Sequence, residues 1–223
     1  MIRRFMVGVT TLLVTACSVV TPIQAKATNT SSNYAFFFTP HQDDEILSMG
    51  TAIKAMVNSK HRTYVVLLTN GGSSWYCLKV FATKAQCVAE RDMEFINGVR
   101  SMGAIPIIPN HRAVDGKLTV AYAQHVLSQY HTIYPTAMLR TMSQYDKSPD
   151  HANLGTALYN LHLFSLSQWY IKQTERATRK GIYTARFNQT VTLNKYPFGH
   201  ISVAADFAVA ADPKGNIGKY YTH

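Results

Sequence analysis

Short apolar runs alternate along the chain with longer segments in which apolar residues recur at helical spacing. Apolar runs of this kind, rich in β-branched and aromatic residues, are typical of buried strands. They predict strands at 34–40, 63–70, 104–109 and 136–142. The other segments predict helices from 44 to about 58, from about 84 to 102, over 120–130 and, as the longest, from near His151 to about Gln173. Gly103 stands where such a helix commonly ends.

This alternation predicts an α/β fold, a Rossmann-like three-layer sandwich whose mainly parallel sheet is covered by helices on both faces. Ligands of such sheets bind outside the carboxyl ends of the strands, so we expect the active site at that edge. The rule brings together three segments, HQDDE, NGGSSW and SQYDKSPDHANLG, which follow the first, second and fourth predicted strands. Residues 182–223 are less regular: YTARFNQTVTLNKY alternates as an edge strand or a hairpin does, and DPKGNIG is typical of a loop.

Residues 1–27 have the three parts of a secretory signal peptide: a basic start (MIRRF), an apolar core (MVGVTTLLVTA) and a small-residue exit (PIQAKA). The apolar core is too short for a membrane span. An alternative stays open, because VTAC at 14–17 also resembles a bacterial lipoprotein cleavage box in which Cys17 would carry the lipid. We therefore expect a secreted, periplasmic or cell-envelope protein that touches the membrane only through such an anchor. Residues 28–33 would be a polar linker, and 34–223 a single domain.

Without its first 27 residues the chain carries a net charge of +7. A basic surface favours anionic surroundings such as cell-wall polymer, phospholipid or a phosphorylated substrate, although ordinary solvated charge explains it equally well. Nucleic acid is a poorer match for an exported protein.

Cys77 and Cys87 are the only cysteines left after processing, and in an exported protein such a pair favours a disulfide. The alternative, a metal site, lacks ligands nearby, because 71–90 contains no histidine.

One histidine and three acids follow the first predicted strand directly: His41, Asp43, Asp44 and Glu45. If Asp44 begins a helix, His41 and Asp44 lie three residues apart and can face one point. An imidazole and a carboxylate there suit a divalent metal, zinc above all. Asp43 would aim slightly elsewhere, within reach of water at the metal. The alternative is helix capping, because acids in a first turn favour the helix dipole.

A second histidine, His151, opens the helix predicted after the fourth strand, at the same edge of the sheet. Together with the first loop it would supply three protein ligands and leave one position for water, the layout of a catalytic zinc centre. Asp150, just before it, would orient a ligand histidine from the second shell. Taken alone, His151 is more typical of a surface or capping residue, so the prediction depends on the two segments together.

Both segments match signatures of a known family. PHQDDE at 40–45 resembles the P-H-P-D-D-E signature of the LmbE-like/PIG-L deacetylases, zinc enzymes that remove N-acetyl or other N-acyl groups from amino sugars. PDHANLG at 149–155 resembles their second signature, H-x-D-H-x-x-x-G. VVLLTNG at 65–71 and ERDMEFINGVRSMGA at 90–104 are similar to the family's second strand and the helix after it. The likeness covers roughly residues 34–160, in the right order and spacing.

The resemblance implies that His41, Asp44 and His151 bind zinc, or another divalent metal, and that Asp43 is the general base. Such a base can take a proton from water at the metal and return it to the departing amine. Arg91 resembles a family position that contacts substrate. An ion pair with neighbouring acids on its helix is the alternative for Arg91.

The sequence departs from the family at two signature positions. Gln42 replaces a proline, which we expect to change little beyond the stiffness of the loop. Ser148, which would still contact substrate, replaces a histidine that in the family assists at the oxyanion or the leaving group, and a serine cannot act as a cationic donor. Tyr145 could substitute by donating to an oxyanion, or could equally be a packed aromatic. Trp75 could stack on a sugar face, on a loop that the disulfide would pin as one wall of the pocket.

These features predict an exported zinc-dependent hydrolase that removes an N-acetyl or other N-acyl group from an amino sugar or glycan. Two alternatives stay open. One is a glycan-binding protein of the same fold that has lost catalysis, which Ser148 would allow. The other is a metal-dependent esterase, which would use the same machinery on a different acyl linkage.

Overall fold

The computed structural model describes residues 33–171 except 75, 76, 78 and 80, together with the backbone of four strands farther along the chain. The predicted signal peptide at 1–27, its lipoprotein alternative at Cys17, residues 28–32 of the predicted linker and the predicted loop DPKGNIG lie outside the described residues. None of the helices in the described part of the chain combines the length and the apolar character that a membrane span needs.

Strands and helices alternate from the start of the described chain to residue 171. In order they are β1 (Tyr34–Thr39), α1 (Asp44–Asn58), β2 (Arg62–Leu67), α3 (Lys84–Ser101), β3 (Ile105–Ile107), α4 (Val120–Ile133), β4 (Met138–Met142), α5 (Pro149–Asn160) and β5 (Ser167–Ile171). Four strands follow: β6 (Tyr183–Phe187), β7 (Val191–Lys195), β8 (Gly199–Val203) and β9 (Asp206–Val209). As predicted, Gly103 lies just after α3 and adopts a left-handed backbone with φ of 84°.

The main sheet has seven strands in the order β3-β2-β1-β4-β5-β9-β6. The first five are parallel, and β9 runs antiparallel between β5 and β6. Strands β7 and β8 form a separate antiparallel pair. The predicted α/β fold with a mainly parallel sheet is therefore confirmed.

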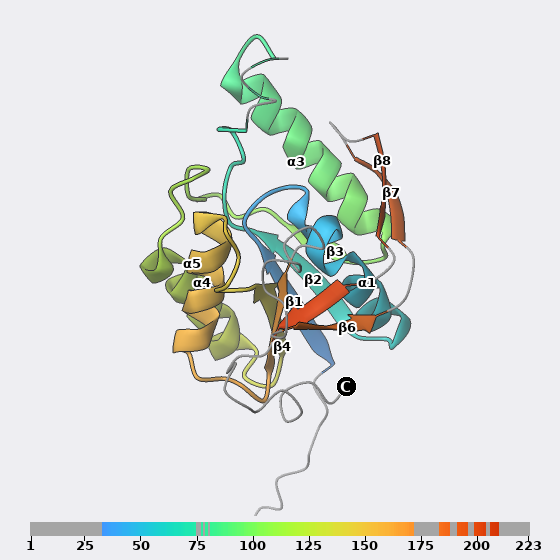
Figure 1. Ribbon diagram of the computed structural model, residues 1–223, viewed down its shortest axis with the longest axis vertical. Helices are drawn as coiled ribbons and strands as arrows, with labels where there is room; N and C mark the ends of the chain where they lie inside the picture. The colour runs from blue at the N-terminus through green and yellow to red at the C-terminus, as the bar shows by residue number, and fades with distance from the viewer. Residues whose placement is uncertain are drawn as a thin grey trace, which may run out of the picture. The chain divides into compact units, whose positions relative to one another are not determined.

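Alternate residues of the central strands face two separate apolar cores. In β1, Phe37 packs with residues of α1 and α3, such as Ile53 and Phe95. Phe36 and Phe38 point the other way and pack with residues of α4 and α5, such as Leu127. Figure 1 shows α4 and α5 on one side of the strands and α1 and α3 on the other. Burial of both sheet faces explains why the strands read as continuous apolar runs.

The helix predicted from His151 to Gln173 is wrong in its second half. Helix α5 ends at Asn160, and His162 adopts a left-handed backbone with φ of 54°. Residues 167–171 form β5 instead, and all five are buried. Trp169 packs with the core under α4 and α5, whereas Tyr170 packs with the core under α1. Ser167 and Gln168 are buried along with the three apolar residues, so β5 lacks the alternation of apolar and polar positions that would predict a strand.

The alternating stretch at 182–195 divides between two sheets. Strand β6 lies at the edge of the main sheet, which confirms the predicted edge strand. Strand β7 pairs with the next strand, β8, and not with β6. The antiparallel pair is thus formed by Val191–Lys195 and Gly199–Val203.

Candidate metal and catalytic site

The loops that follow the parallel strands meet at the carboxyl edge of the sheet. They line a cleft of about 230 Å³ together with Arg91 from α3 and His151 from α5. The lining residues are His41, Asp43, Ser73, Ser74, Arg91, Asp115, Ser148 and His151. Of the three segments that the sequence assigned to this edge, each contributes at least one residue.

The turn from β1 into α1 brings His41 against Asp44. Thr39 Oγ1 donates to the carbonyl oxygen of His41, and the His41 amide donates to Asp44 Oδ2 at 3.2 Å. Helix α1 begins at Asp44, and Asp43 occupies the N-cap position without a capping hydrogen bond from its side chain. Asp43 therefore does not cap the helix through its carboxylate, which faces the cleft.

Three donor atoms converge at one side of His41. Its Nδ1 lies 2.9 Å from Asp44 Oδ2 and 3.2 Å from His151 Nε2, and His151 Nε2 lies 3.0 Å from the same Asp44 oxygen. Tetrahedral zinc with bonds of about 2.0–2.1 Å places its ligand atoms about 3.3 Å apart, close to these spacings. A divalent cation satisfies three lone pairs at once, whereas one proton is shared between two atoms. These residues therefore fit a divalent metal.

His151 is held in place by the chain around α5. Its Nδ1 lies 3.0 Å from Asp146 Oδ2, and a proton at Nδ1 leaves the lone pair of Nε2 directed at Asp44. Gly155, one turn further along α5, packs against the backbone after β4. A Cβ at this position would lie 2.1 Å from the Gln144 nitrogen and 2.4 Å from the Ser143 carbonyl carbon. The glycine of the PDHANLG motif is thus what allows α5 to bring His151 to the cleft.

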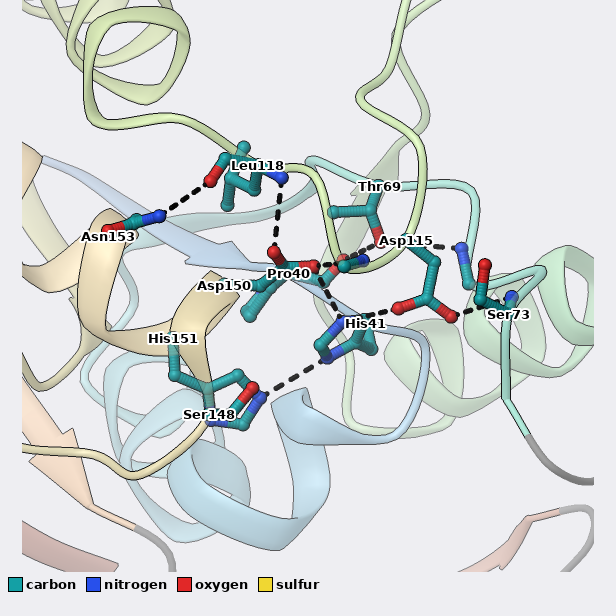
Figure 2. A network of polar contacts seen from close by, with 12 residues as sticks. Pro40, His41, Thr69, Ser73, Asp115, Leu118, Ser148, Asp150, His151 and Asn153 are labelled. Carbon is teal, nitrogen blue, oxygen red and sulfur yellow. Dashed lines mark hydrogen bonds and ion pairs between the residues drawn. The ribbon is translucent and has the colours of Figure 1, made fainter.

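The other nitrogen of His41 faces two carboxylates (Figure 2). His41 Nε2 lies 3.1 Å from Asp150 Oδ2 and 3.1 Å from Asp115 Oδ1. Asp150 also accepts from the amides of Gly116 at 2.8 Å and Leu118 at 3.1 Å, and Asp115 accepts from the Ser73 amide at 2.8 Å. A proton on Nε2 then leaves Nδ1 free for a metal.

Electrostatics on this side favour a protonated His41 in the metal-free protein. Burial lowers the pKa of His41, but hydrogen bonds to Asp115, Asp150 and Asp44 raise it, and the net pKa lies well above the ordinary value. Burial raises the pKa of Asp150, yet the hydrogen bond from His41 and the Gly116 amide bring it below its ordinary value. The pKa of Asp115 is lowered in the same way, burial being outweighed by His41 and the Ser73 amide.

Arg91 lies beside Asp43 in the cleft. Its side chain is 7% exposed, NH1 donates to the Gly71 carbonyl at 2.8 Å, and NH2 lies 3.6 Å from Asp43 Oδ1. The ion pair that Arg91 makes among the described residues is with Asp43, in the turn after β1. Arg91 therefore reaches both the cleft and the predicted base.

The remaining predicted residues differ in whether the structure places them at the cleft. Ser148 lines the cleft, and its amide donates to Asp146 Oδ1 at 2.9 Å. Tyr145 packs against the core under α4 and α5 and is not among the lining residues, so the structure does not bring it to the cleft. Trp75 lies outside the described residues. The predicted disulfide is present between Cys77 and Cys87, with Cα atoms 5.3 Å apart, and ties the loop after β2 to α3.

Two acids of the site were missed by the sequence analysis, and a third residue was underestimated. Asp115 lies in a loop without periodicity, and nothing marked it beyond the glycine and leucine that follow. Asp146 stands five residues before His151, a spacing that the sequence alone does not distinguish from any other loop acid. Gln42 was expected to affect only loop stiffness, but its side chain is 1% exposed and hydrogen-bonded.

The sequence from 36 to 162 matches the model of the family described as PIG-L, GlcNAc-PI de-N-acetylase. This match covers more than half of the chain. The chain belongs to the PIG-L family. The predicted membership is thereby confirmed, and the family's description as a de-N-acetylase agrees with the predicted class of amide hydrolase. None of the curated proteins matches the sequence.

Solved structures share the fold at low sequence identity. The N,N'-diacetylchitobiose deacetylase of Pyrococcus horikoshii, solved with an inhibitor, is 19% identical over 60% of this chain with a TM-score of 0.52. The match spans 51% of that protein, about half its length. A deacetylase of teicoplanin biosynthesis, solved with teicoplanin, is 13% identical over 74% of this chain and 81% of its own, with a TM-score of 0.55. A pseudoaglycone deacetylase linked to an antimicrobial reagent is 14% identical over 69% and 72%, also with a TM-score of 0.55.

Proposed function

We propose that this protein is an exported zinc-dependent hydrolase that removes an N-acetyl group, or another N-acyl group, from an amino sugar or glycan. The observation that carries the proposal is the convergence of His41 Nδ1, Asp44 Oδ2 and His151 Nε2 within 3.2 Å of one another, beside Asp43, in a PIG-L family chain. The solved neighbours named as deacetylases support the reaction class.

His41, Asp44 and His151 would hold the zinc. When bound there, zinc supplies a Lewis acid for the acyl oxygen and makes water more acidic. Asp150 and Asp115 keep His41 oriented through Nε2, and Asp146 does the same for His151 through Nδ1. Each ligand histidine is thus fixed by a carboxylate on its far side.

Asp43 would move the proton. Its carboxylate lies at the cleft and makes no capping hydrogen bond, so it is available to take a proton from the attacking water. The same carboxyl group then gives the proton to the amine nitrogen as the C–N bond breaks. Arg91, with its guanidinium 3.6 Å from Asp43 Oδ1, orients that carboxylate and also reaches the cleft, where it can contact a sugar hydroxyl.

Ser148 takes the place of the family histidine and faces the same cleft. A hydroxyl can donate a hydrogen bond to substrate but carries no charge, so it stabilises an oxyanion less than a cationic imidazole does. Because Tyr145 packs against the core, zinc and Ser148 would share this role without the tyrosine. We therefore expect a slow enzyme and not an inert one.

The substrate would lie outside the cytoplasmic membrane. This part of the proposal is supported by the signal-peptide pattern of residues 1–27 and by the Cys77–Cys87 disulfide, which is typical of oxidising compartments. A cell-envelope or extracellular glycan, or a secreted glycoside, fits that location. The basic mature chain is compatible with an anionic glycan.

The experiment that tests the proposal pairs metal content with product release. Protein lacking residues 1–27 is purified and its zinc counted, and acetate release is measured from N-acetylated sugars, N,N'-diacetylchitobiose and longer chito-oligosaccharides. We expect about one zinc per chain and release that a chelator abolishes. Acetate esters in the same panel test the esterase alternative. Full zinc loading with no release from any substrate would favour the glycan-binding alternative, and absence of zinc binding would contradict the proposal.

A further inference from the structure

Gln42 ties the loop after β1 to the loop after β2 and to helix α3. Its Nε2 donates to the Asn70 carbonyl, in the loop after β2, and to Asp92 Oδ1 on α3, both at 3.0 Å. Gly71 leaves room for it, because a Cβ there would lie 1.9 Å from Gln42 Oε1. An almost fully buried amide placed between two other elements fixes the distance between them.

Asp92 is in turn held by a bidentate ion pair with Arg112, in the loop after β3. Arg112 NH1 lies 2.8 Å from Asp92 Oδ1, and NH2 lies 2.7 Å from Asp92 Oδ2. Arg112 NH1 also donates to the Thr69 carbonyl at 3.2 Å, at the end of β2. Both side chains are less than one-fifth exposed. Paired planar groups of this kind hold their geometry more tightly than single contacts do.

Asp43, the predicted base, follows Gln42 directly in the chain. The turn that carries it has no capping hydrogen bond from the Asp43 side chain to hold it. Its backbone carbonyl accepts from the Leu47 amide at 3.0 Å, and its carboxylate pairs with Arg91. Arg91 lies one residue before Asp92 on α3, so the group that anchors Gln42 and the group that orients Asp43 belong to the same stretch of helix.

We propose that Gln42, Asp92 and Arg112 form a clamp that positions Asp43 for proton transfer. Of the described residues that line the cleft, none is a clamp residue, so the clamp would act through Asp43 and its members are positioning residues. The inference rests on the proposed hydrolase activity for its kinetic consequence. Its structural consequence, a fixed backbone at Asp43, does not depend on activity.

The kinetic test compares variants that release the clamp with one that does not. Gln42→Met keeps the length of the side chain and removes both hydrogen bonds, and Asp92→Asn keeps its shape and weakens the pair with Arg112. For zinc-loaded protein we expect kcat to fall about 10- to 100-fold, KM to change less than about twofold and zinc content to stay complete, because a small displacement of a catalytic group is enough for such a loss. Glu90→Gln, an exposed acid on α3 two residues from Asp92, makes the same charge change and is expected to leave kcat unaltered.

A second measurement separates positioning from stability and needs no substrate. Amide hydrogen exchange in the metal-free protein is followed at Leu47, whose N–H donates to the Asp43 carbonyl, and at Ile53, deeper in α1. We expect Gln42→Met and Asp92→Asn to accelerate exchange at Leu47 at least about fivefold relative to Ile53, because only the first turn is released. If a variant fails to fold, Arg112→Lys, which keeps the charge and loses the bidentate geometry, replaces it.

The kinetic test and the hydrogen-exchange test would be contradicted by different results. Unchanged kcat per zinc-loaded molecule, or equal acceleration at Leu47 and Ile53, would overturn the clamp and leave a purely structural network. A wild-type protein that releases no acetate from any substrate would contradict the proposed function, while the exchange comparison would still decide the clamp. Non-additive effects in the double variant Gln42→Met with Asp92→Asn are expected, because the two residues share one hydrogen bond.

Discussion

The two ring nitrogens of His41 both lie among carboxylates, but their surroundings differ in kind. On the Nδ1 side, one oxygen of Asp44 lies within 3.0 Å of two imidazole nitrogens. On the Nε2 side, Asp150 accepts two backbone amides and Asp115 accepts one, in addition to the histidine. Each side offers three groups close enough to hold a cation.

The types of ligand and their burial favour the Nδ1 side as the metal site. Asp115 and Asp150 already receive directional hydrogen bonds from loop amides, and their place opposite a ring N–H is the one that orienting groups occupy at metal sites. Asp44 accepts the His41 amide, and its carboxylate converges with a second imidazole, that of His151; the two side chains are 0% and 1% exposed. One carboxylate and two imidazoles form a ligand set that suits zinc. The comparison teaches that proximity of three acids or histidines is not enough to assign a metal site, and that the other hydrogen bonds of each ligand must be counted.

Removal of a metal-ligating side chain on the Nδ1 side of His41 should have the largest effect on zinc content and activity. We expect His151→Ala to lose both zinc and activity, because two remaining protein ligands hold zinc weakly. Zinc per chain after dialysis, measured by plasma mass spectrometry, checks this. Asp115→Asn, on the other side, serves as the matched control and should keep its zinc. Undiminished zinc in His151→Ala would show that the ligand assignment is wrong.

Neutralising the base should leave the metal and remove the reaction. For Asp43→Asn we expect kcat to fall about 10²- to 10⁴-fold with zinc content unchanged, because an amide cannot accept the proton. Steady-state kinetics on zinc-quantified protein measures this. Near-normal turnover would remove Asp43 from the mechanism and leave Arg91 without its proposed partner.

Changes on the Nε2 side should weaken zinc binding without abolishing it. Asp150→Asn is expected to lower zinc affinity about 10- to 100-fold, the usual loss when an orienting group is changed. Asp115→Asn should cost less, since Asp115 is more exposed than Asp150 and accepts one backbone amide where Asp150 accepts two. Competition against a chromophoric chelator gives both affinities. Equal loss of zinc for Asp150→Asn and His151→Ala would contradict the claim that the metal ligands lie on the Nδ1 side and the orienting groups on the Nε2 side.

The smallest expected effect is a shift in the pH dependence of zinc affinity. Because the pKa of His41 is raised in the metal-free protein, zinc must displace a proton, so affinity should fall as the pH drops below that pKa, by about tenfold per pH unit. Asp115→Asn removes one of the hydrogen bonds that raise the pKa and should shift the profile to lower pH. Chelator competition across a pH series measures the shift. A profile that moves to higher pH in Asp115→Asn would contradict the role given to Asp115.

Sequence reasoning recovered the parts of the site that local patterns encode. The runs before His41 and before the turn to His151 were read as parallel strands, and the edge rule then brought the two histidines together across 110 residues. Family signatures added the roles of Asp43 and Asp44. The strand and helix predictions are confirmed because strand ends and helix starts are marked by composition within a few residues, whereas the roles of Asp43 and Asp44 stay predictions.

The parts that failed depend on contacts between distant segments. Asp115 and Gln42 are placed by the register of one loop against another, which no periodicity records. Tyr145 follows a strand end just as the residues that line the cleft do, and only its packing against the core sets it apart. Strand β5 was missed because burial on both faces removed its alternation, so tertiary packing overrode the local pattern.

The most direct test of the account is to locate the metal. Anomalous diffraction at the zinc edge, from crystals of zinc-loaded protein lacking residues 1–27, gives its position independently of any assay. We predict one peak about 2 Å from His41 Nδ1, Asp44 Oδ2 and His151 Nε2. A peak on the opposite side of the imidazole, between Asp115 and Asp150, would contradict the assignment of the two sides and the mechanism built on it.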